Sequence, residues 1–376
     1  MRIVVDQDLH LQQLEIPADW ELVKREGRLI NSEDVRDADA LLIRSVTRVN
    51  EALLHNSRVR FVGTATSGLD HIDRAYLAAN TIRLADAAGA NANAVSDYCL
   101  AALAFGVLQR ELDIAEARIA IVGAGHVGGL LANKLRRLGL HVLVCDPPLQ
   151  QSGAPGEFSS LAEAATCDVV SLHVPLQESG EHATREFIDA DILSAMPGTG
   201  MLINSCRGEV IDELALQAHL RDNEKFTAVL DVWQNEPRVN PETMALAHIA
   251  TPHIAGYSAR AKDEAAARIV DALKVFSGSA TGPADAARAG SGDRDTGAVV
   301  PDPGNRQGWK TVLQHFDLPA LSHAFRQAYR SGIEKQAFDA MRRQLASRRE
   351  FCETRVVEVS EETAGFLGAL GFKLES

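Results

Sequence analysis

The sequence predicts an α/β fold with two parallel-sheet domains, a cleft between them and a small α/β C-terminal domain. Short β-branched segments alternate with helix-length amphipathic stretches, a pattern typical of parallel sheets built from βαβ units. The alternation occurs twice, before and after one long apolar helix. The predicted strands are Arg2–Val5, Ala40–Ile43 and Arg60–Gly63, then Arg118–Val122, His141–Cys145, Val169–His173, Met201–Asn204 and Ala228–Val232.

Two long helices are predicted to connect these sets of strands. Asn93–Gln109 is apolar through its middle and lies between the sets, whereas Ala259–Phe276 follows the last strand and can return the chain to the first domain. Two crossings of this kind predict a hinge. We therefore expect a flavodoxin-like substrate-binding domain of residues 1–92 with 258–280, and a Rossmann-like dinucleotide-binding domain of residues 93–257.

The C-terminal part of the chain differs in composition. Residues 281–308 are rich in glycine, alanine, proline, serine and aspartate, which predicts a flexible linker. Residues 309–376 form the expected C-terminal domain and have too few apolar residues for a large core, so we expect packing against another chain. Its predicted elements are helices at Leu318–Arg330, Ile333–Leu345 and Glu361–Leu370, and a strand at Thr354–Ser360.

Charge and hydropathy indicate the class of partner. The 376 residues carry 38 lysines and arginines against 51 acidic residues, a formal charge of −13, and no basic patch. This argues against a nucleic-acid or acidic-membrane partner and favours a small molecule. The longest apolar run, Tyr98–Leu108, is too short for a membrane span, and no signal-type region precedes the first strand, so we expect a cytoplasmic protein.

The cysteines and histidines give no sign of a metal site. Five cysteines, an odd number without any CxxC pair, argue against a disulfide framework and a structural zinc site. His71, His173 and His182 have no carboxylate or cysteine partner at ligand-like spacing, so no metal is expected. The cysteines are Cys99, Cys145, Cys167, Cys206 and Cys352.

A GxGxxG turn follows the strand Arg118–Val122 and precedes an amphipathic stretch. Gly123 permits the tight turn, Gly125 lets the backbone approach a pyrophosphate, and Gly128 lets helix and strand pack closely. The amides at the start of the next helix can hold the anion. A bare GxGxxG is weak evidence, but here the expected strand and helix surround it.

Asp146 strengthens this prediction. It ends the strand His141–Cys145, 18 residues after Gly128. A carboxylate there can accept hydrogen bonds from the adenosine ribose and would repel a 2′-phosphate, so NAD is favoured over NADP. The alternative is that the glycines serve packing alone and Asp146 only caps a turn. The coincidence of both features at this spacing favours the dinucleotide.

Polar clusters follow three later strands, at Asn204–Glu209, Asp231–Pro237 and Thr251–Gly256. The carboxyl ends of parallel strands face one crevice, so Arg207, Glu236 and His253 are expected to meet there. Taken separately, the arginine could form a surface salt bridge, the glutamate a turn before proline, and the histidine part of a core. Together, downstream of a dinucleotide turn, they predict a hydride-transfer site.

With these motifs, residues 1–280 resemble the D-isomer-specific 2-hydroxyacid dehydrogenases. The resemblance implies that Arg207 binds the substrate carboxylate, that His253 exchanges the hydroxyl proton and that Glu236 pairs with His253. A guanidinium grips a carboxylate with two prongs. A carboxylate beside an imidazole raises its proton affinity and fixes its tautomer. Formate dehydrogenases of the same superfamily have glutamine in place of Glu236, so that branch is disfavoured.

Further segments resemble one branch of this family, which oxidises 4-phosphoerythronate in vitamin B6 biosynthesis and has an extra dimerisation domain. Tyr257 is informative because general relatives have a small residue there. The resemblance implies substrate contacts at Ser45, Thr66 and Tyr257, with NAD as cofactor and a homodimer formed through the C-terminal domain. The segments are Arg44–Thr47, Val49–Asn50, Gly63–Gly68, Asp70–His71, Cys145–Pro148, His253–Tyr257 and Arg348–Phe351.

The same resemblance implies the cofactor contacts. Asp231 would orient the nicotinamide carboxamide, and Cys206 would contribute its backbone because no base is evident to activate its thiol. Val174 stands where relatives often have threonine, so it offers only apolar packing or its backbone. For the substrate's distal phosphate, candidates are Arg44, Ser45, Tyr257 and an arginine of the C-terminal domain. The implied NAD contacts are Gly123, Gly125, His126, Val127, Gly128, Asp146, Val174, Ser205, Cys206, Arg207, Asp231 and Gly256.

The expected reaction is oxidation of 4-phospho-D-erythronate to (R)-3-hydroxy-2-oxo-4-phosphooxybutanoate, with NAD⁺ accepting the hydride. Two alternatives stay open at this point. One is another D-2-hydroxyacid dehydrogenase, such as an enzyme acting on 3-phosphoglycerate. The other is a NAD-dependent binding protein of the corepressor type, which can retain the Arg–Glu–His set. Fold alone does not separate them.

Overall fold

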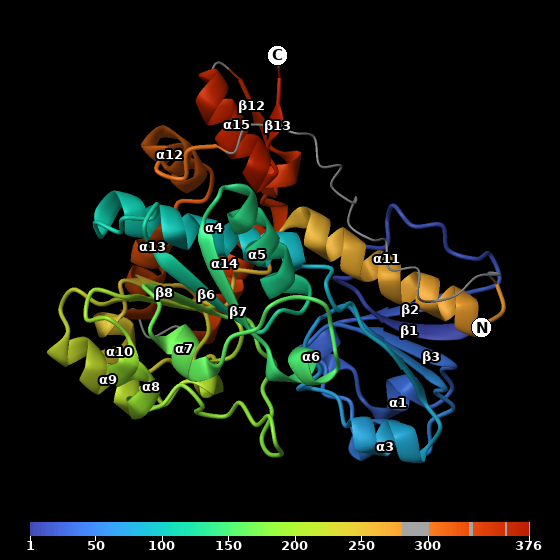
Figure 1. Cartoon of the computed structure of the whole chain (residues 1–376). Coiled ribbons are helices and arrows are strands. Elements are labelled where there is room, and N and C mark those ends of the chain that lie inside the picture. The colour runs from blue at the N-terminus through green and yellow to red at the C-terminus, as the bar shows by residue number, and fades with distance from the viewer. Residues whose placement is uncertain (280–300, 331–333, 358, 376) are drawn as a thin grey trace. The chain divides into compact units, whose positions relative to one another are not determined.

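A computed structural model describes residues 1–279, 301–330, 334–357 and 359–375 (Figure 1). The chain divides into two compact units, residues 1–91 with 259–297 and residues 92–258 with 298–376. Residues 280–300, which include most of the expected linker at 281–308, lie outside the described residues. Both units are α/β structures built on parallel sheets, which confirms the predicted fold class.

In the first unit, the described residues form a five-stranded parallel sheet in the order β2-β1-β3-β4-β5. Figure 1 shows α11 on one face of this sheet and α1 and α3 on the other. Alternate residues therefore enter two cores: Ile3 and Val5 pack with Ile269 of α11, whereas Val4 packs with Val35 and Leu77 of the opposite helices. The strands are β1 (Arg2–Asp6), β2 (Glu21–Arg25), β3 (Ala40–Ile43), β4 (Phe61–Thr64) and β5 (Arg83–Ala85). The helices are α1 (Ser32–Val35), α2 (Glu51–Leu54), α3 (Arg74–Ala79) and α11 (Ala259–Phe276).

In the second unit, the described residues form a six-stranded parallel sheet in the order β11-β10-β9-β8-β6-β7. The chain first adds β7 beside β6 and then continues from β8 on the other side, so the strand order reverses between β6 and β8. In open α/β sheets, ligands bind at the carboxyl ends of the strands at such a reversal. The strands are β6 (Arg118–Val122), β7 (His141–Cys145), β8 (Val169–Leu172), β9 (Met201–Asn204), β10 (Thr227–Leu230) and β11 (Ile249–Ala250).

Both faces of this second sheet are covered, as expected for parallel strands. Ile119 and Ile121 of β6 enter the core that contains α4, whereas Ala120 and Val122 enter the core beneath the helices of the other face. The helix α4 is buried along almost its whole length, which explains why it lacks a polar face. The helices are α4 (Ala92–Gln109), α5 (His126–Arg137), α6 (Pro147–Gln151), α7 (Leu161–Ala165), α8 (Ala190–Ala195), α9 (Glu213–Asp222) and α10 (Pro241–Leu246).

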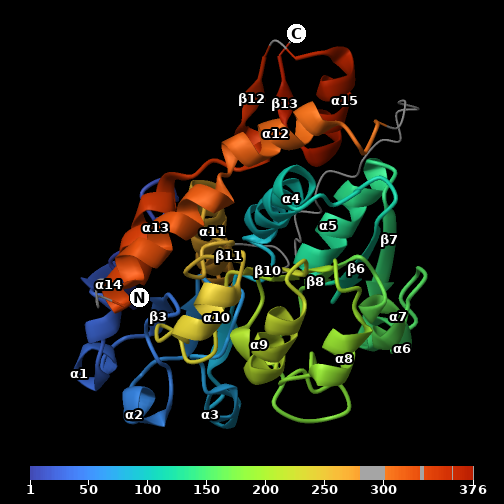
Figure 2. The same cartoon turned by 90° about the vertical axis from the view of Figure 1, so that its left-hand side faces the viewer.

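The C-terminal segment belongs to the second unit. Figure 2 shows α12 lying over α4 and α13 beside β11, and the backbone N–H of Ala250 donates to Ser322 Oγ at 2.9 Å. Trp309 of α12 is fully buried against Phe366, with ring centroids 5.0 Å apart. The elements are α12 (Arg306–His315), α13 (Leu318–Arg330), α14 (Glu334–Gln344), α15 (Glu361–Leu370), β12 (Arg355–Val356) and β13 (Lys373–Leu374).

Several elements differ from the sequence-based expectations. The helix α12 begins at Arg306, inside the last residues of the expected linker, because Asn305 caps it and Trp309 anchors it. Of the strand predicted at Thr354–Ser360, the described residues form β12 at Arg355–Val356, and residue 358 lies outside the described residues. The strands β2, β5 and β11 were not predicted, and each is short or half-exposed. Short 3-10 helices occur at Gly27–Leu29, Gly208–Val210, Leu345–Ser347 and Phe351–Glu353. No described helix is both long and apolar enough to span a membrane.

Candidate active site

The glycine turn between β6 and α5 requires its glycines. Gly123 has a φ of +89°, and a Cβ there would lie 2.7 Å from the backbone oxygen of His173. A Cβ on Gly128 would lie 1.9 Å from the backbone oxygen of Gly123, so only glycine allows this packing of helix on turn. Gly125 is different, because a Cβ there would meet nothing within 4 Å. It faces open space into which a ligand can approach the backbone.

The start of α5 fits an anion. Gly125 is the N-cap, and no side chain of the described structure caps the helix there. The first amides of the helix, including those of His126 and Val127, therefore depend on solvent or a ligand for hydrogen bonds. A helix N-terminus with exposed amides favours a phosphate group. This arrangement suits the pyrophosphate of a dinucleotide.

Asp146 lies against the glycine turn. Its Oδ2 accepts a hydrogen bond from the N–H of Ala124 at 2.7 Å, and its Oδ1 accepts from the N–H of Leu149 at 3.0 Å, capping α6. The capping role that the sequence offered as an alternative is therefore real. It also brings the carboxylate to the turn, where a ribose reader is expected. The ribose contact itself stays a prediction.

His253 and Glu236 form a hydrogen-bonded pair. His253 Nδ1 lies 2.9 Å from Glu236 Oε2. Because a carboxylate only accepts, Nδ1 donates, and the lone pair of the ring is then at Nε2. The side chains are 36% and 23% exposed, so the pair is partly shielded from solvent and still accessible. A base with this tautomer is suited to removing a hydroxyl proton.

The carboxylate of Glu236 is held on both oxygens. Its Oε1 accepts from the N–H of Trp233 at 3.1 Å, while Oε2 accepts from His253 and, at 3.3 Å, from Arg342 Nη2. Burial alone would raise the pKa of Glu236, but the charges of His253 and Arg342 and the donated hydrogen bonds outweigh it and lower this pKa. Glu236 is therefore ionised beside the imidazole.

Asp231 anchors the segment that carries His253. It is fully buried, and its carboxylate accepts from the N–H groups of Ile254 and Ala255, both at 2.8 Å, and from Thr251 Oγ1 at 2.6 Å. Burial raises the pKa of Asp231, although His253 and these donors oppose the rise. The expected contact with the nicotinamide carboxamide stays a prediction. The anchoring role is one that the sequence analysis missed.

Arg207 follows β9 in a turn shaped by Asn204. Asn204 Oδ1 accepts from the N–H of Cys206 at 3.1 Å, and Asn204 Nδ2 donates to the backbone oxygen of Arg207 at 2.9 Å. A Cβ on Gly208 would lie 2.0 Å from the backbone carbon of Trp233. The turn of Arg207 and the loop of Glu236 therefore touch. This places two of the three predicted clusters side by side.

The other predicted cofactor contacts surround these turns. A Cβ on Gly123 would lie 3.0 Å from Val174 Cγ1, so Val174 packs beside the glycine turn. Ser205 Oγ lies 3.7 Å from Cys99 Sγ. Burial raises the pKa of Cys206 to about 11, so its thiol is a poor nucleophile near neutral pH. Gly256 is partly buried in the segment held by Asp231.

The three predicted substrate residues are divided between the two units, with Ser45 and Thr66 in the first and Tyr257 in the second. Tyr257 belongs to the second unit, and its ring centroid lies 5.8 Å from Arg342 Cζ. Ser45 is exposed in the turn after β3 of the first unit. Thr66, also of the first unit, donates to the backbone oxygen of Gly68 at 2.9 Å and contacts Thr64 Oγ1 at 2.8 Å.

Arg44 is a weaker phosphate candidate than the sequence suggested. Its guanidinium forms two hydrogen bonds with Asp6, at 2.9 and 3.1 Å, and one with Asp8 at 2.6 Å. Asp6 is fully buried and needs this cation as a partner. A phosphate would have to compete with two carboxylates for Arg44.

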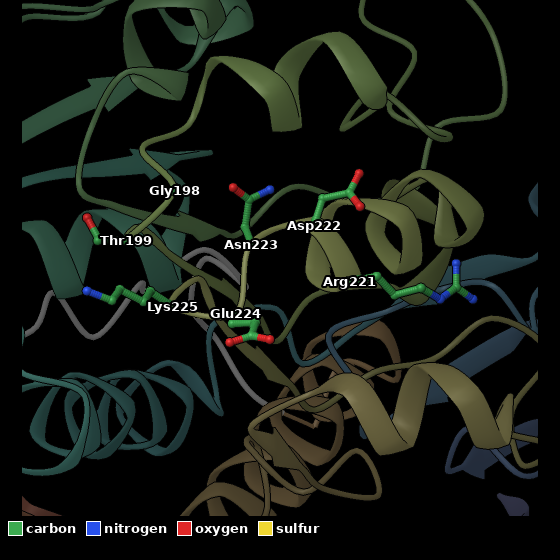
Figure 3. Close-up of a pocket in the computed structure, with 7 residues that line it drawn as sticks. All are labelled: Gly198, Thr199, Arg221, Asp222, Asn223, Glu224 and Lys225. Carbon is green, nitrogen blue, oxygen red and sulfur yellow. The ribbon is translucent and has the colours of Figure 1, made fainter.

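A separate pocket lies beside the amino ends of β9 and β10 in the second sheet, and Figure 3 shows the residues that line it. It has a volume of about 550 Å³ and comes from the loops that precede β9 and β10. The polar clusters follow the carboxyl ends of these strands, so this pocket is not part of their site. Among the described residues, no three His, Cys, Asp or Glu side chains gather to hold a metal. The residues that line the pocket are Gly198, Thr199, Arg221, Asp222, Asn223, Glu224 and Lys225.

Comparisons with known proteins agree with this geometry. The model of the D-isomer specific 2-hydroxyacid dehydrogenase, NAD binding domain, matches residues 106–255. The structure of D-lactate dehydrogenase from Aquifex aeolicus, complexed with NAD and lactic acid, superposes with a TM-score of 0.60 at 21% identity. That alignment covers 74% of this chain and 96% of the other, and it shows the shared fold.

Several curated relatives match over the whole length. The chain is 39% identical over 396 residues to the erythronate-4-phosphate dehydrogenase of Marinobacter nauticus, covering 100% of both proteins. It is 39% identical over 391 residues to the enzyme of that name from Pseudomonas paraeruginosa, again covering 100% of both. These matches confirm the resemblance found in the sequence. The chain belongs to the erythronate-4-phosphate dehydrogenases, within the D-isomer specific 2-hydroxyacid dehydrogenase family.

Proposed function

We propose that this chain oxidises 4-phospho-D-erythronate to (R)-3-hydroxy-2-oxo-4-phosphooxybutanoate with NAD⁺, as a step of vitamin B6 biosynthesis. The observation that carries the proposal is the hydrogen bond of 2.9 Å between His253 and Glu236 in the NAD-binding domain. The full-length identity to erythronate-4-phosphate dehydrogenases selects this substrate among 2-hydroxy acids.

The glycine turn fits the cofactor. The open space at Gly125 and the uncapped start of α5 suit the pyrophosphate, with His126 and Val127 supplying amides. Asp146 would accept hydrogen bonds from the ribose hydroxyls. Bound NAD⁺ supplies the hydride acceptor. The remaining contacts expected from the family pattern are Val174, Ser205, Cys206, Arg207, Asp231 and Gly256.

The chain's own groups account for the proton transfer. His253 Nε2 removes the proton of the 2-hydroxyl group, and the carbon–oxygen bond becomes a carbonyl as the hydrogen on that carbon leaves as hydride. Glu236, ionised and hydrogen-bonded to Nδ1, stabilises the imidazolium that forms. In the reverse direction the imidazolium returns the proton.

Substrate orientation needs a cationic partner for the carboxylate. Arg207 has the planar guanidinium that binds a carboxylate through two parallel hydrogen bonds. We assign this role to Arg207, and further substrate contacts to Ser45, Thr66 and Tyr257. The hydroxyl of Ser45 and the phenol of Tyr257 would add donors for the polar substrate, whereas Thr66, whose proton goes to the backbone oxygen of Gly68, would accept a hydrogen bond.

We propose further that the chain works as a cytoplasmic homodimer assembled through its C-terminal segment. Val357, directly after β12, and Leu374, in β13, are 55% and 45% exposed, and a partner could cover them. The five cysteines are free thiols in the described structure, which suits a reducing compartment. Light scattering of the purified protein tests the dimer.

An anaerobic assay tests the reaction. Purified protein is mixed with NAD⁺ and 4-phosphoerythronate, and the absorbance of reduced nicotinamide is followed. A second run adds a 2-oxo acid, which detects a cofactor that stays bound and is recycled. A higher kcat/KM with 3-phosphoglycerate than with 4-phosphoerythronate would show that 3-phosphoglycerate is the preferred substrate. Bound NAD without turnover on either acid would favour a binding protein of the corepressor type.

A further inference from the structure

The C-terminal helix α14 places a charged side chain on the catalytic pair. Arg342 Nη2 lies 3.3 Å from Glu236 Oε2, the oxygen that also accepts from His253 Nδ1. Arg342 is 106 residues beyond Glu236 in the chain, and residues 334–344 belong to the same compact unit as the pair. One carboxylate oxygen thus links the base to the C-terminal segment.

The guanidinium of Arg342 is fixed from several sides. Its Nε donates to the backbone oxygen of Pro252 at 3.1 Å, directly before His253 in the chain. Its Cζ lies 5.0 Å from the ring centroid of Phe338 and 5.8 Å from that of Tyr257. Cation–π contacts at these distances favour a held guanidinium. Arg342 therefore contacts Pro252 before His253 and Tyr257 after it. It also contacts Glu236, the acidic partner of His253.

We propose that Arg342 is a positioning residue of the active site, which holds Glu236 toward His253 and moderates the charge that the imidazole meets. The inference rests on the function proposed above, in which His253 is the base. It gives the C-terminal segment, which lies outside the residues 106–255 matched by the family model, a part in positioning the catalytic pair.

The sign of the effect follows from the charges around His253. Glu236, from the loop after β10, and the carboxylate of Asp231 favour the imidazolium. Arg342, from α14, opposes it and shares the Glu236 oxygen, and Arg207 is the cation expected from the loop after β9. Removal of Arg342 leaves Glu236 held by Trp233 N–H and His253. The unshared carboxylate then binds the imidazole proton more tightly, so oxidation requires a higher pH.

Matched variants test this effect in the full-length protein. Arg342→Met keeps an unbranched apolar stem against the two rings and removes the charge, whereas Arg342→Lys keeps the charge. Arg343→Met is the control, because Arg343 is the exposed neighbour on the same helix. If Arg342→Met fails to fold, Arg342→Gln replaces it.

The first readout is the pH profile of kcat/KM for oxidation. In Arg342→Met the acid limb moves up by roughly half a pH unit or more, and the activity recovers at high pH to within about threefold of wild type. Arg343→Met follows wild type, and Arg342→Lys, which keeps the charge but not the planar donors, shifts by less than Arg342→Met. In a Glu236→Gln background the shift caused by Arg342→Met shrinks to less than half, because the effect passes through that carboxylate.

The second readout needs neither substrate nor cofactor. The Cε1 proton of His253, assigned by its loss in His253→Gln, is titrated by NMR, and its midpoint rises in Arg342→Met only. If wild type shows no oxidation, the proposed function fails while this titration still tests Arg342. An unchanged or lowered midpoint in Arg342→Met, or an equal shift in Arg343→Met, overturns the inference.

Discussion

Glu236 and His253 are joined at 2.9 Å through Oε2 and Nδ1, and the same carboxylate accepts the backbone N–H of Trp233. The two residues come from loops that follow neighbouring strands, β10 and β11, of the second sheet. The pair is therefore a product of the sheet's topology, since parallel strands end at one edge. Its chemistry follows from an ionised acid holding the proton at Nδ1.

Glu236→Gln tests the charge of this pair. Glutamine retains the acceptor oxygen but loses the charge that stabilises the imidazolium. We expect kcat/KM for oxidation to fall about tenfold to a hundredfold. The acid limb of its pH profile should move to lower pH, because the imidazole then holds its proton less tightly. Steady-state kinetics across pH provide the measurement, and a profile identical to wild type would refute the role of Glu236.

Arg207→Ala tests the carboxylate anchor. Loss of a bidentate, charge-assisted contact is worth about 3 kcal/mol, or roughly a hundredfold in kcat/KM. Arg207→Lys should recover part of this loss, since it restores the charge without the planar pair of donors. Kinetics with varied 4-phosphoerythronate measure the effect. Normal turnover by the alanine variant would show that another group binds the carboxylate.

Asp146→Ser tests the choice of cofactor. Serine can still cap α6, so the turn should persist, while the charge that would repel a 2′-phosphate is gone. The ratio of kcat/KM with NADP to that with NAD should rise by about tenfold or more. Thermal unfolding serves as the control for the cap. Unchanged rejection of NADP in a folded variant would point to a different ribose reader.

Gly125→Ala and Gly128→Ala separate ligand binding from folding. A Cβ at Gly125 meets nothing within 4 Å, so the variant should unfold within about 2 °C of wild type but bind NAD⁺ at least roughly tenfold more weakly. A Cβ at Gly128 would lie 1.9 Å from Gly123 O, so that variant should lose stability as well. Calorimetry and NAD⁺ titration measure both. Tight NAD⁺ binding by Gly125→Ala would place the pyrophosphate elsewhere.

The sequence predicted most of the elements that build the two larger sheets and the helices against them. The strands Arg118–Val122 and His141–Cys145 and the helix Ala259–Phe276 have the predicted bounds, because apolar and β-branched residues mark the strands and apolar residues at helical spacing mark the helix. The strands β5 and β11 escaped prediction, since three and two residues carry too little pattern. The helix α12 was missed because polar residues surround its anchor, Trp309.

The candidate site was predictable where function follows strand order, and not where it depends on tertiary contacts. His253 and Glu236 were paired from a family pattern, and the structure places them in contact. Arg342 lies on a helix far along the chain, and its arginine-rich surroundings give no sign of an active-site role. The competition of Asp6 for Arg44 also arises only after folding.

The most direct test of His253 as the base compares wild type with His253→Gln in a single anaerobic turnover. With enzyme in excess over 4-phosphoerythronate and with NAD⁺ present, wild type should form reduced nicotinamide in proportion to the acid added. His253→Gln should bind NAD⁺ with nearly unchanged affinity and form reduced nicotinamide at least about a hundredfold more slowly. Equal rates for the two proteins would contradict the assignment of His253 as the base.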